Sequence, residues 1–182
     1  MRSLCDDMKV MALACVLGFA TLAQPVVVAA QTGQPGDQYG DWTLQCEERA
    51  AESRECWLVQ VMRRADDQRF LAEIRLGLSR SDDAPRHVMV MRTPTGILLT
   101  ARPAFRVDDD MTDTPMTWNN CTERQCVAVQ TLDPTDVDRL RRGLRMAIGY
   151  QPVRERQPTV FEVSLVGVTN GLAELEARAG GN

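Results

Sequence analysis

The stretch that decides the fold class is FLAEIRLGL, residues 70–78. Its apolar side chains recur at every second position, and Glu73, Arg75 and Gly77 are among the residues between them. Successive side chains of a β-strand point to opposite faces, so a period of two predicts a strand with one face in the core. We therefore expect a half-buried strand over residues 70–78.

The same alternation continues on both sides of this strand. The turn Pro94-Thr95-Gly96, for example, separates a run that ends at Thr93 from a second apolar run. The further expected strands are residues 39–45, 56–62, 88–93, 97–101, 105–107, 126–132, 145–150 and 159–165. Many short strands separated by turn signals predict an all-β sandwich or barrel.

Two short helices are expected to interrupt the strands. Asp133 can cap a helix that has Pro134 at its first position, and Val137, Leu140 and Leu144 follow at helical spacing. A second apolar stripe at this spacing comes near the end of the chain: Val168, Leu172 and Leu175. We expect both helices to pack over an edge or an end of a sheet.

The first thirty residues have the features of a secretory signal peptide. Their apolar run from Val10 to Ala23 is too short to cross a bilayer comfortably, and Val28 and Ala30 precede Gln31 as a small-residue cleavage site. We expect cleavage before Gln31, export to the periplasm or the outer surface, and no integral membrane span afterwards.

The length and composition narrow the class of protein further. A chain of 182 residues supports a single domain with a real core. The net charge of −4 and the aromatic content of 5% argue against a nucleic-acid partner, which would require a basic face with stacking rings. The expected organisation is a signal peptide (1–30), a flexible leader (31–38), one sandwich domain (39–178) and a frayed tail (179–182).

Four cysteines remain once the signal peptide is removed: Cys46, Cys56, Cys121 and Cys126. In an exported chain they predict disulfides, for which three connectivities exist. Local pairing is favoured, because each sequential couple flanks a short polar segment that a hairpin would close. A zinc site or a redox motif would require a two-residue spacing or histidine ligands, so we expect no metal and no cofactor.

The residues that could carry catalysis are few. His87 is the only histidine and has no nucleophile in a recognisable local signature. The run Asp108-Asp109-Asp110 with Asp113 lacks the glycine and glutamate of a calcium-binding EF-hand loop, and we interpret it as a solvated loop. We expect no catalytic residues. An envelope glycan hydrolase that uses Asp108, Asp110 and Asp113 is one alternative, and a small-ligand carrier with an apolar cavity is another.

Arg139, Arg142 and Arg145 recur at helical spacing near the end of the first expected helix. Cations at a helix C-terminus are favoured by the helix dipole, which is a sufficient local role. The alternative is that they contact an anionic envelope component, and we take these three arginines as the candidate binding residues.

The order of several landmarks resembles the invasion-associated locus B family of exported bacterial proteins. These landmarks are Tyr39-Gly40-Asp41-Trp42, Cys46 and Cys56, Thr93-Pro94-Thr95-Gly96-Ile97-Leu98-Leu99, Phe105-Arg106-Val107-Asp108, Cys121 and Cys126, and Val163-Ser164-Leu165-Val166-Gly167. The resemblance implies an immunoglobulin-like β-sandwich, export and, in some pathogenic members, a link to host-cell invasion. It implies no catalytic residues. We expect a non-enzymatic envelope protein whose surface binds an envelope or host component.

Overall fold

The computed structural model describes residues 36–48, 54–79 and 85–180. All of these residues belong to one compact unit, Gln31–Asn182. The expected signal peptide and its cleavage site, most of the expected leader and the last two residues lie outside the described residues.

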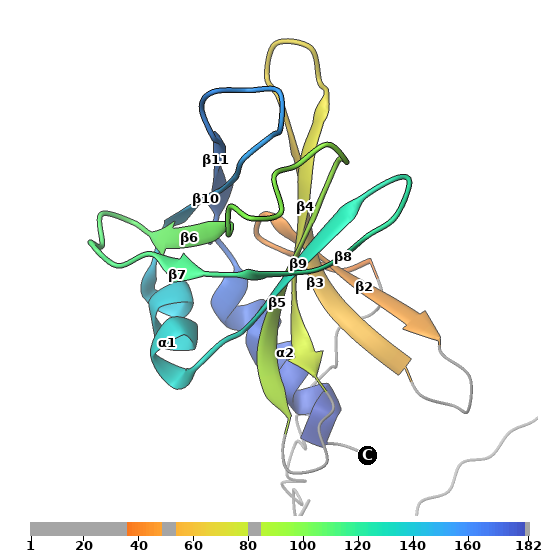
Figure 1. Ribbon diagram of the computed structural model, residues 1–182. Helices are drawn as coiled ribbons and strands as arrows, with labels where there is room; N and C mark the ends of the chain where they lie inside the picture. The colour runs from red at the N-terminus through yellow and green to blue at the C-terminus, as the bar shows by residue number, and fades with distance from the viewer. Residues whose placement is uncertain (1–35, 49–53, 80–84, 181–182) are drawn as a thin grey trace, which may run out of the picture. The chain divides into compact units, whose positions relative to one another are not determined.

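The described chain is all-β, with two antiparallel sheets and two helices (Figure 1). The larger sheet has the order β1 (Gln38–Tyr39), β2 (Trp42–Glu48), β3 (Arg54–Arg63), β4 (Phe70–Ser79), β5 (Arg86–Thr93), β9 (Cys126–Thr131) and β8 (Thr117–Cys121). The smaller has the order β11 (Thr159–Ser164), β10 (Arg145–Tyr150), β6 (Ala104–Val107) and β7 (Thr114–Pro115). The helices are α1 (Pro134–Arg142) and α2 (Val168–Gly180). The predicted fold class, an antiparallel β-sandwich with two packing helices, is confirmed.

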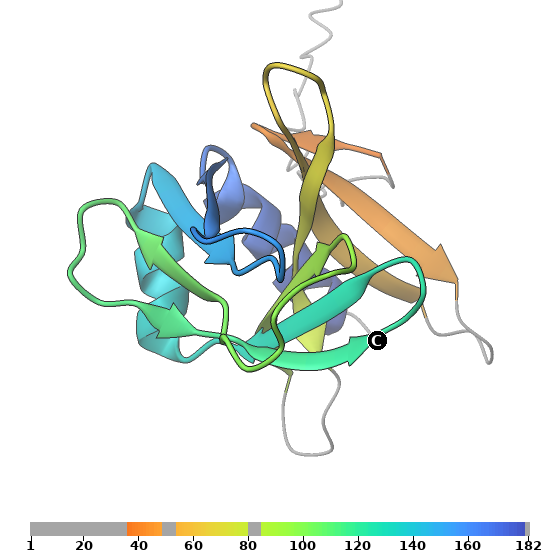
Figure 2. The same cartoon turned by 45° about the horizontal axis from the view of Figure 1, so that its top comes forward.

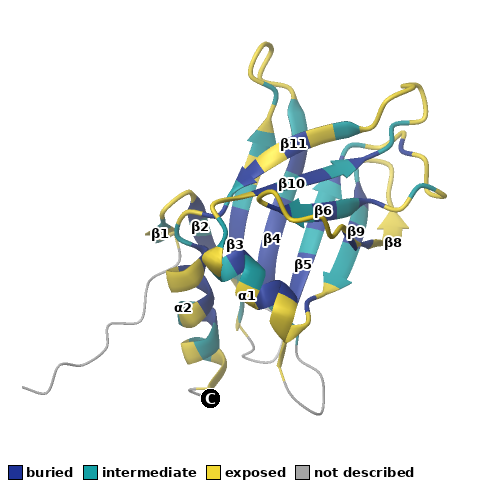
Figure 3. Ribbon diagram, turned by 90° about the vertical axis from the view of Figure 1, so that its left-hand side faces the viewer, coloured by how far each residue is buried: buried dark blue, intermediate teal, exposed yellow. Residues whose placement is uncertain are grey.

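The core lies between the larger sheet and a second layer made of the smaller sheet and the helices (Figures 2 and 3). Ala72, Ile74 and Leu76 of β4 are fully buried on the inner face, as the alternation predicted. The helix α2 packs closely on this face, since a Cβ atom at Gly171 would lie 2.5 Å from the Leu58 side chain. Phe105 and Ile148 close the core from the smaller sheet.

Several element boundaries differ from the prediction. Residues 97–101 are not a strand, because Ile97 forms a single bridge with Pro152 and the following residues turn. The strand β8 was not expected, because its residues are largely exposed and show no apolar alternation. Gln38, expected in the leader, pairs with Thr43 in the first hairpin.

The first helix begins as predicted and ends earlier. Asp133 caps α1 by accepting a hydrogen bond of 2.8 Å from the backbone N–H of Asp136, and Pro134 is the first helical residue. The helix ends at Arg142, so the exposed Leu144 lies beyond it. The second helix extends to Gly180, into the segment expected to be a frayed tail.

The motif around Trp42 meets the motif around Ser164, although the two are far apart in the sequence. The indole Nε1 of Trp42 donates a hydrogen bond of 2.8 Å to the carbonyl oxygen of Ser164. Gly40 and Gly167 both have positive φ, and a Cβ atom at Gly167 would lie 2.0 Å from the Tyr39 carbonyl oxygen. Only glycine tolerates this approach. The segment around Trp42 and the segment around Ser164 therefore pack directly against each other.

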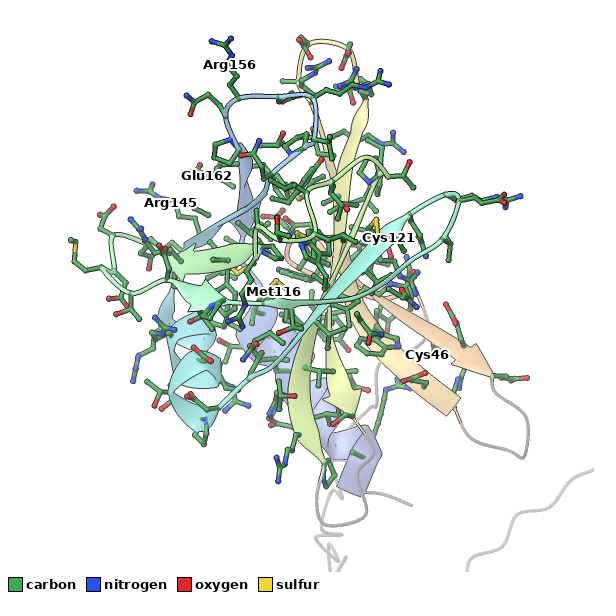
Figure 4. All side chains as sticks on the ribbon, in the orientation of Figure 1. Cys46, Met116, Cys121, Arg145, Arg156 and Glu162 are labelled. Atoms are coloured by element: carbon green, nitrogen blue, oxygen red, sulfur yellow. A yellow bond between two sulfur atoms is a disulfide. The ribbon has the colours of Figure 1, made fainter. Side chains whose placement is uncertain are left out.

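Two disulfides join neighbouring strands. Cys46 of β2 bonds to Cys56 of β3, and Cys121 of β8 bonds to Cys126 of β9. Each couple forms a directly opposed pair in its hairpin, with 4.0 Å between the Cα atoms. This is the local connectivity that the sequence favoured, and Figure 4 labels one cysteine of each bridge.

Candidate functional site

The three candidate arginines lie beside acidic residues. Arg139 donates a hydrogen bond of 3.0 Å to Asp110, forms an ion pair with Asp136 and bonds to the hydroxyl of Thr114. The hydrogen bond with Asp136 is the main reason that the pKa of Arg139 is raised. Arg139 thus serves local structure at the end of α1.

Arg145 and Arg142 complete the set. Arg145 is the first residue of β10, as the strand expected over residues 145–150 predicts, and its guanidinium lies 3.7 Å from both Asp109 and Glu162 (Figure 4). Arg142 is exposed and forms no ion pair with the part of the chain that the structure describes. A hollow of about 220 Å³ beside Arg139 and Arg142 is also lined by Asp108 and Asp110. The three arginines therefore form a surface of mixed charge.

The aspartates proposed for a hydrolase are occupied by structural contacts. Asp108 accepts hydrogen bonds from the backbone N–H groups of Leu144 and Arg145. Asp113 pairs with Arg106 at 2.9 Å, and this hydrogen bond lowers the pKa of its carboxyl group. The bond from Arg139 lowers the pKa of Asp110 in the same way. A general acid requires a raised pKa, so Asp110 and Asp113 are poorly suited to that role.

His87, interpreted from the sequence as isolated, has a partner in α2 that also binds an arginine of α1. Its Nε2 lies 2.8 Å from Oε1 of Glu176 in α2, and the same oxygen accepts a hydrogen bond of 2.5 Å from Arg141 in α1. The His87 side chain is only 20% exposed. Because Glu176 lies 89 residues further along the chain, no local sequence signal could reveal this cluster.

The His87 cluster borders a cavity of about 560 Å³. This cavity opens between the start of β5, the end of β9 and α1. Its lining residues are Pro85, Arg86, His87, Thr131, Leu132, Asp133, Pro134, Val137, Asp138 and Arg141. Its volume lies within the range of about 300–1,000 Å³ that is usual for small-molecule sites. The structure thus supplies a cavity of the size that the ligand-carrier alternative requires.

The face of the larger sheet that points away from the core is the second notable surface. Within the described ranges, the smaller sheet and both helices lie on the opposite face (Figure 3). The strand register places three rows of side chains on this outer face: Trp57, Gly77, Val88 and Thr131; then Val59, Arg75, Val90 and Val129; then Val61, Glu73, Arg92 and Val127. We call these twelve residues the outer face.

The outer face is unusually apolar for a sheet surface on which no described element packs. Val59 and Val88 are buried, but Val61 is 45% exposed and Trp57, Val90, Val127 and Val129 are half-buried. The outward residues of a one-sided antiparallel sheet are usually polar. Trp57 lies flat on the sheet over Gly77, where a Cβ atom would come within 2.4 Å of the indole ring. Apolar residues therefore occupy both faces of β3 and β5.

The charges on the outer face neutralise one another. Arg75 is 6% exposed and donates a hydrogen bond of 2.6 Å to Glu73, with Glu47 of β2 at 3.5 Å on its other side. Arg92 also reaches Glu73, at 3.3 Å. Two arginines and two glutamates thus leave no net charge among these groups.

Residues 36–48, 54–79 and 85–180 contain no group of three or more histidine, cysteine, aspartate or glutamate side chains arranged to bind a metal ion. None of their helices is long and apolar enough to cross a membrane.

These features define a class: a two-sheet β-sandwich with hairpin disulfides whose notable surfaces are suited to binding. The sequence profile of the invasion associated locus B (IalB) protein family matches residues 42–176, and the chain belongs to this family. The family is named for invasion and not for a reaction.

The relatives and a solved structure agree with this assignment. Invasion protein B homologs from two strains of Brucella abortus, 2308 and biovar 1 strain 9-941, are each 26% identical over 143 residues. The match covers 78% of this chain and 79% of each relative. The crystal structure of invasion associated protein b from Bartonella henselae has a TM-score of 0.66 at 21% identity, over 79% of this chain and 96% of that one. At this identity the structural likeness supports the fold.

Proposed function

We propose that this protein is an exported, non-enzymatic binding protein of the bacterial envelope, and that its outer face contacts a partner protein. The observation that carries the proposal is the apolar outer face, which no described element covers. The names of its family and relatives favour a role in host-cell interaction. The two disulfides and the sequence pattern of residues 1–30 favour the periplasm or the outer surface.

The charge of the outer face selects the class of partner. Membrane lipids, lipopolysaccharide phosphates and nucleic acids are recognised through an excess of positive charge, and Arg75 and Arg92 are already paired with Glu73. Tryptophan and arginine are the residues that most often dominate protein–protein interfaces. The outer face therefore fits a protein with an uncharged, apolar patch.

The size of the outer face suits a transient contact. Four strands at about 4.8 Å spacing and three rows of outward residues cover roughly 19 Å by 20 Å, or about 400 Å². A contact of this area would bury about 800 Å² over both partners, in the range of weak, transient encounters. This size is typical of partners that associate and separate.

A matched pair of variants tests the outer face. Val61 of β3 is 45% exposed on the outer face, and Val160 of β11 is 61% exposed elsewhere. An arginine at position 61 would lie opposite Glu73, so the Val61→Arg variant should fold. We expect V61R to weaken retention of the exported protein on envelope fractions or host cells at least tenfold, and V160R to leave it unchanged.

The oligomeric state distinguishes a different partner protein on the outer face from a second copy of this chain. Light scattering should find wild type and V61R equally monomeric if the partner is a different protein. A wild-type dimer that V61R dissociates would instead assign the outer face to a second copy of this chain and overturn the proposal. Equal retention of wild type and V61R would likewise contradict it.

A further inference from the structure

We infer that three loops at one end of the sandwich contact a membrane surface that contains anionic phospholipid. These loops are residues 63–69 at the β3–β4 turn, residues 94–103 between β5 and β6, and residues 151–158 between β10 and β11. They lie at the top of Figure 1, away from both helices. We call the three loops together the loop end. The inference goes beyond the proposed function, because it concerns a lipid surface at a place other than the outer face.

Two of the loops are joined so that apolar side chains remain outside. Ile97 forms an antiparallel bridge with Pro152, and a backbone hydrogen bond of 2.8 Å flanks this bridge on each side. Since successive residues point to opposite sides, Leu98 and Val153 share the side opposite to the buried Ile97. Leu98 is 42% exposed, Val153 is 60% exposed, and Leu99 in the following turn is 55% exposed. Three large apolar side chains therefore meet solvent close together.

The loop end also carries an excess of positive charge. It contains six arginines and three acidic residues, although the whole chain has a net charge of −4. Asp66 and Asp67 both bind Arg64, so they are engaged within the β3–β4 turn. Figure 4 shows Arg156 extending from the β10–β11 loop away from the rest of the chain. Five guanidinium groups form no ion pair with any described residue, those of Arg63, Arg69, Arg102, Arg154 and Arg156.

This combination of charge and apolar side chains selects an anionic lipid surface. Each arginine near such a membrane strengthens binding about fivefold, and exposed apolar side chains gain free energy by entering the boundary between headgroups and acyl chains. A charge acts over about 8 Å at physiological salt, so these flexible side chains need no fixed orientation. The acidic run Asp108–Asp110 follows the opposite end of β6, about 13 Å away, and leaves the excess in place.

Sedimentation with phospholipid vesicles tests the inference on the exported chain. The probe is a vesicle of equal parts phosphatidylglycerol and phosphatidylcholine, and pure phosphatidylcholine is the neutral comparison. At about 0.05 M salt, binding to the anionic vesicle should be saturable and at least tenfold tighter than to the neutral one. About 0.5 M salt should weaken this binding at least tenfold, because the charges are then screened.

A matched pair of double variants tests the apolar side chains. Leu99→Ser with Val153→Ser should weaken binding to the anionic vesicle at least tenfold, because two inserted side chains are lost. Leu144→Ser with Val166→Ser removes two exposed side chains at the other end of the β10–β11 hairpin and should leave binding unchanged. Circular dichroism should be native for both.

A second matched pair tests the charge. Arg154→Gln with Arg156→Gln should weaken binding about 25-fold, at about fivefold for each arginine. Arg86→Gln with Arg142→Gln changes the net charge equally at two exposed positions outside the loop end. This control should change binding less than about twofold.

Four results would overturn the inference. Wild type could fail to bind the anionic vesicle, or bind the neutral one equally well. An equal loss in the two arginine pairs would reduce the binding to net charge. Unchanged binding after the Leu99 and Val153 substitutions would show that these side chains stay in solvent. Loss of retention on envelope fractions in that variant, without vesicle binding by wild type, would assign the loop end to a protein partner. Because the vesicles contain no protein, a failure to bind them leaves the proposal for the outer face untouched.

Discussion

Replacing Gln60 of β3 by leucine should loosen the contact that ties the last strand of the smaller sheet to the larger sheet. The Gln60 side chain accepts a hydrogen bond of 3.1 Å from the N–H of Ser164 and donates to the carbonyl oxygens of Asp41 and Ser164 at 3.1 and 3.3 Å. One amide thus takes the place of a neighbouring strand at the end of β11.

The cost follows from which groups lose a partner. The carbonyl of Ser164 keeps the hydrogen bond from Trp42, and the exposed carbonyl of Asp41 can bind water. The part-buried N–H of Ser164 has no such replacement, and an unsatisfied donor costs about 1–3 kcal/mol. We expect Gln60→Leu to lower the free energy of unfolding by about 2 kcal/mol. For a domain of this size the midpoint temperature should fall by about 4–8 °C.

Urea unfolding and hydrogen exchange test this expectation. The Ser164 amide should exchange faster in Q60L than in wild type, while amides in the middle of β4 change only in proportion to global stability. Gln45→Leu is the matched control, because Gln45 is exposed on β2 and its side chain has no hydrogen-bond partner within the described ranges. It should stay within about 0.5 kcal/mol of wild type. A Q60L protein as stable as Q45L, or with a still protected Ser164 amide, would refute the reasoning.

Four further expectations can be checked directly. N-terminal sequencing of the periplasmic protein should begin at Gln31, and an intact or lipid-modified start would contradict the signal assignment. Alanine at both cysteines of the β2–β3 disulfide, 10 residues apart, should cost about 2.7 kcal/mol by urea unfolding, and at the β8–β9 disulfide, 5 apart, about 2.1. Gly77→Ala should lift the Trp57 indole off the sheet, because a Cβ atom there lies 2.4 Å from the ring, and should shift its fluorescence to the red. Arg139→Gln should raise the pKa of Asp110 toward its ordinary value, measured by carboxyl NMR; since the wild-type pKa is lowered, the stabilisation from this pair is present above about pH 4 and is lost as the pH falls below it.

Local signals carried most of the fold prediction. The alternation in β4 and the capping residue Asp133 act over a few residues, so they can be recognised in the sequence alone. The favoured disulfide pairing used the same kind of signal, because each bridge spans one hairpin. The prediction failed where local pattern is weak, as in the exposed β8, or where a turn follows an apolar start, as after Ile97.

The candidate arginines show how spacing alone can mislead. The three arginines recur at helical spacing, but only Arg139 and Arg142 belong to α1, and Arg145 begins β10. The neutralising partners of Arg139 and Arg145, Asp110 and Asp109, come from a loop that precedes the helix by more than twenty residues. Charge complementarity of this kind depends on tertiary structure, which the sequence pattern does not specify.

The outer face and the cavity beside His87 lie on opposite sides of β5, because successive residues of a strand point to opposite faces. Val88, Val90 and Arg92 point outward, whereas His87 and Met89 belong to the opposite side of the strand. The nearly continuous apolar run of β5 is therefore a sequence signal for a strand with apolar residues on both faces. A substitution on one side changes one surface and leaves the other in place.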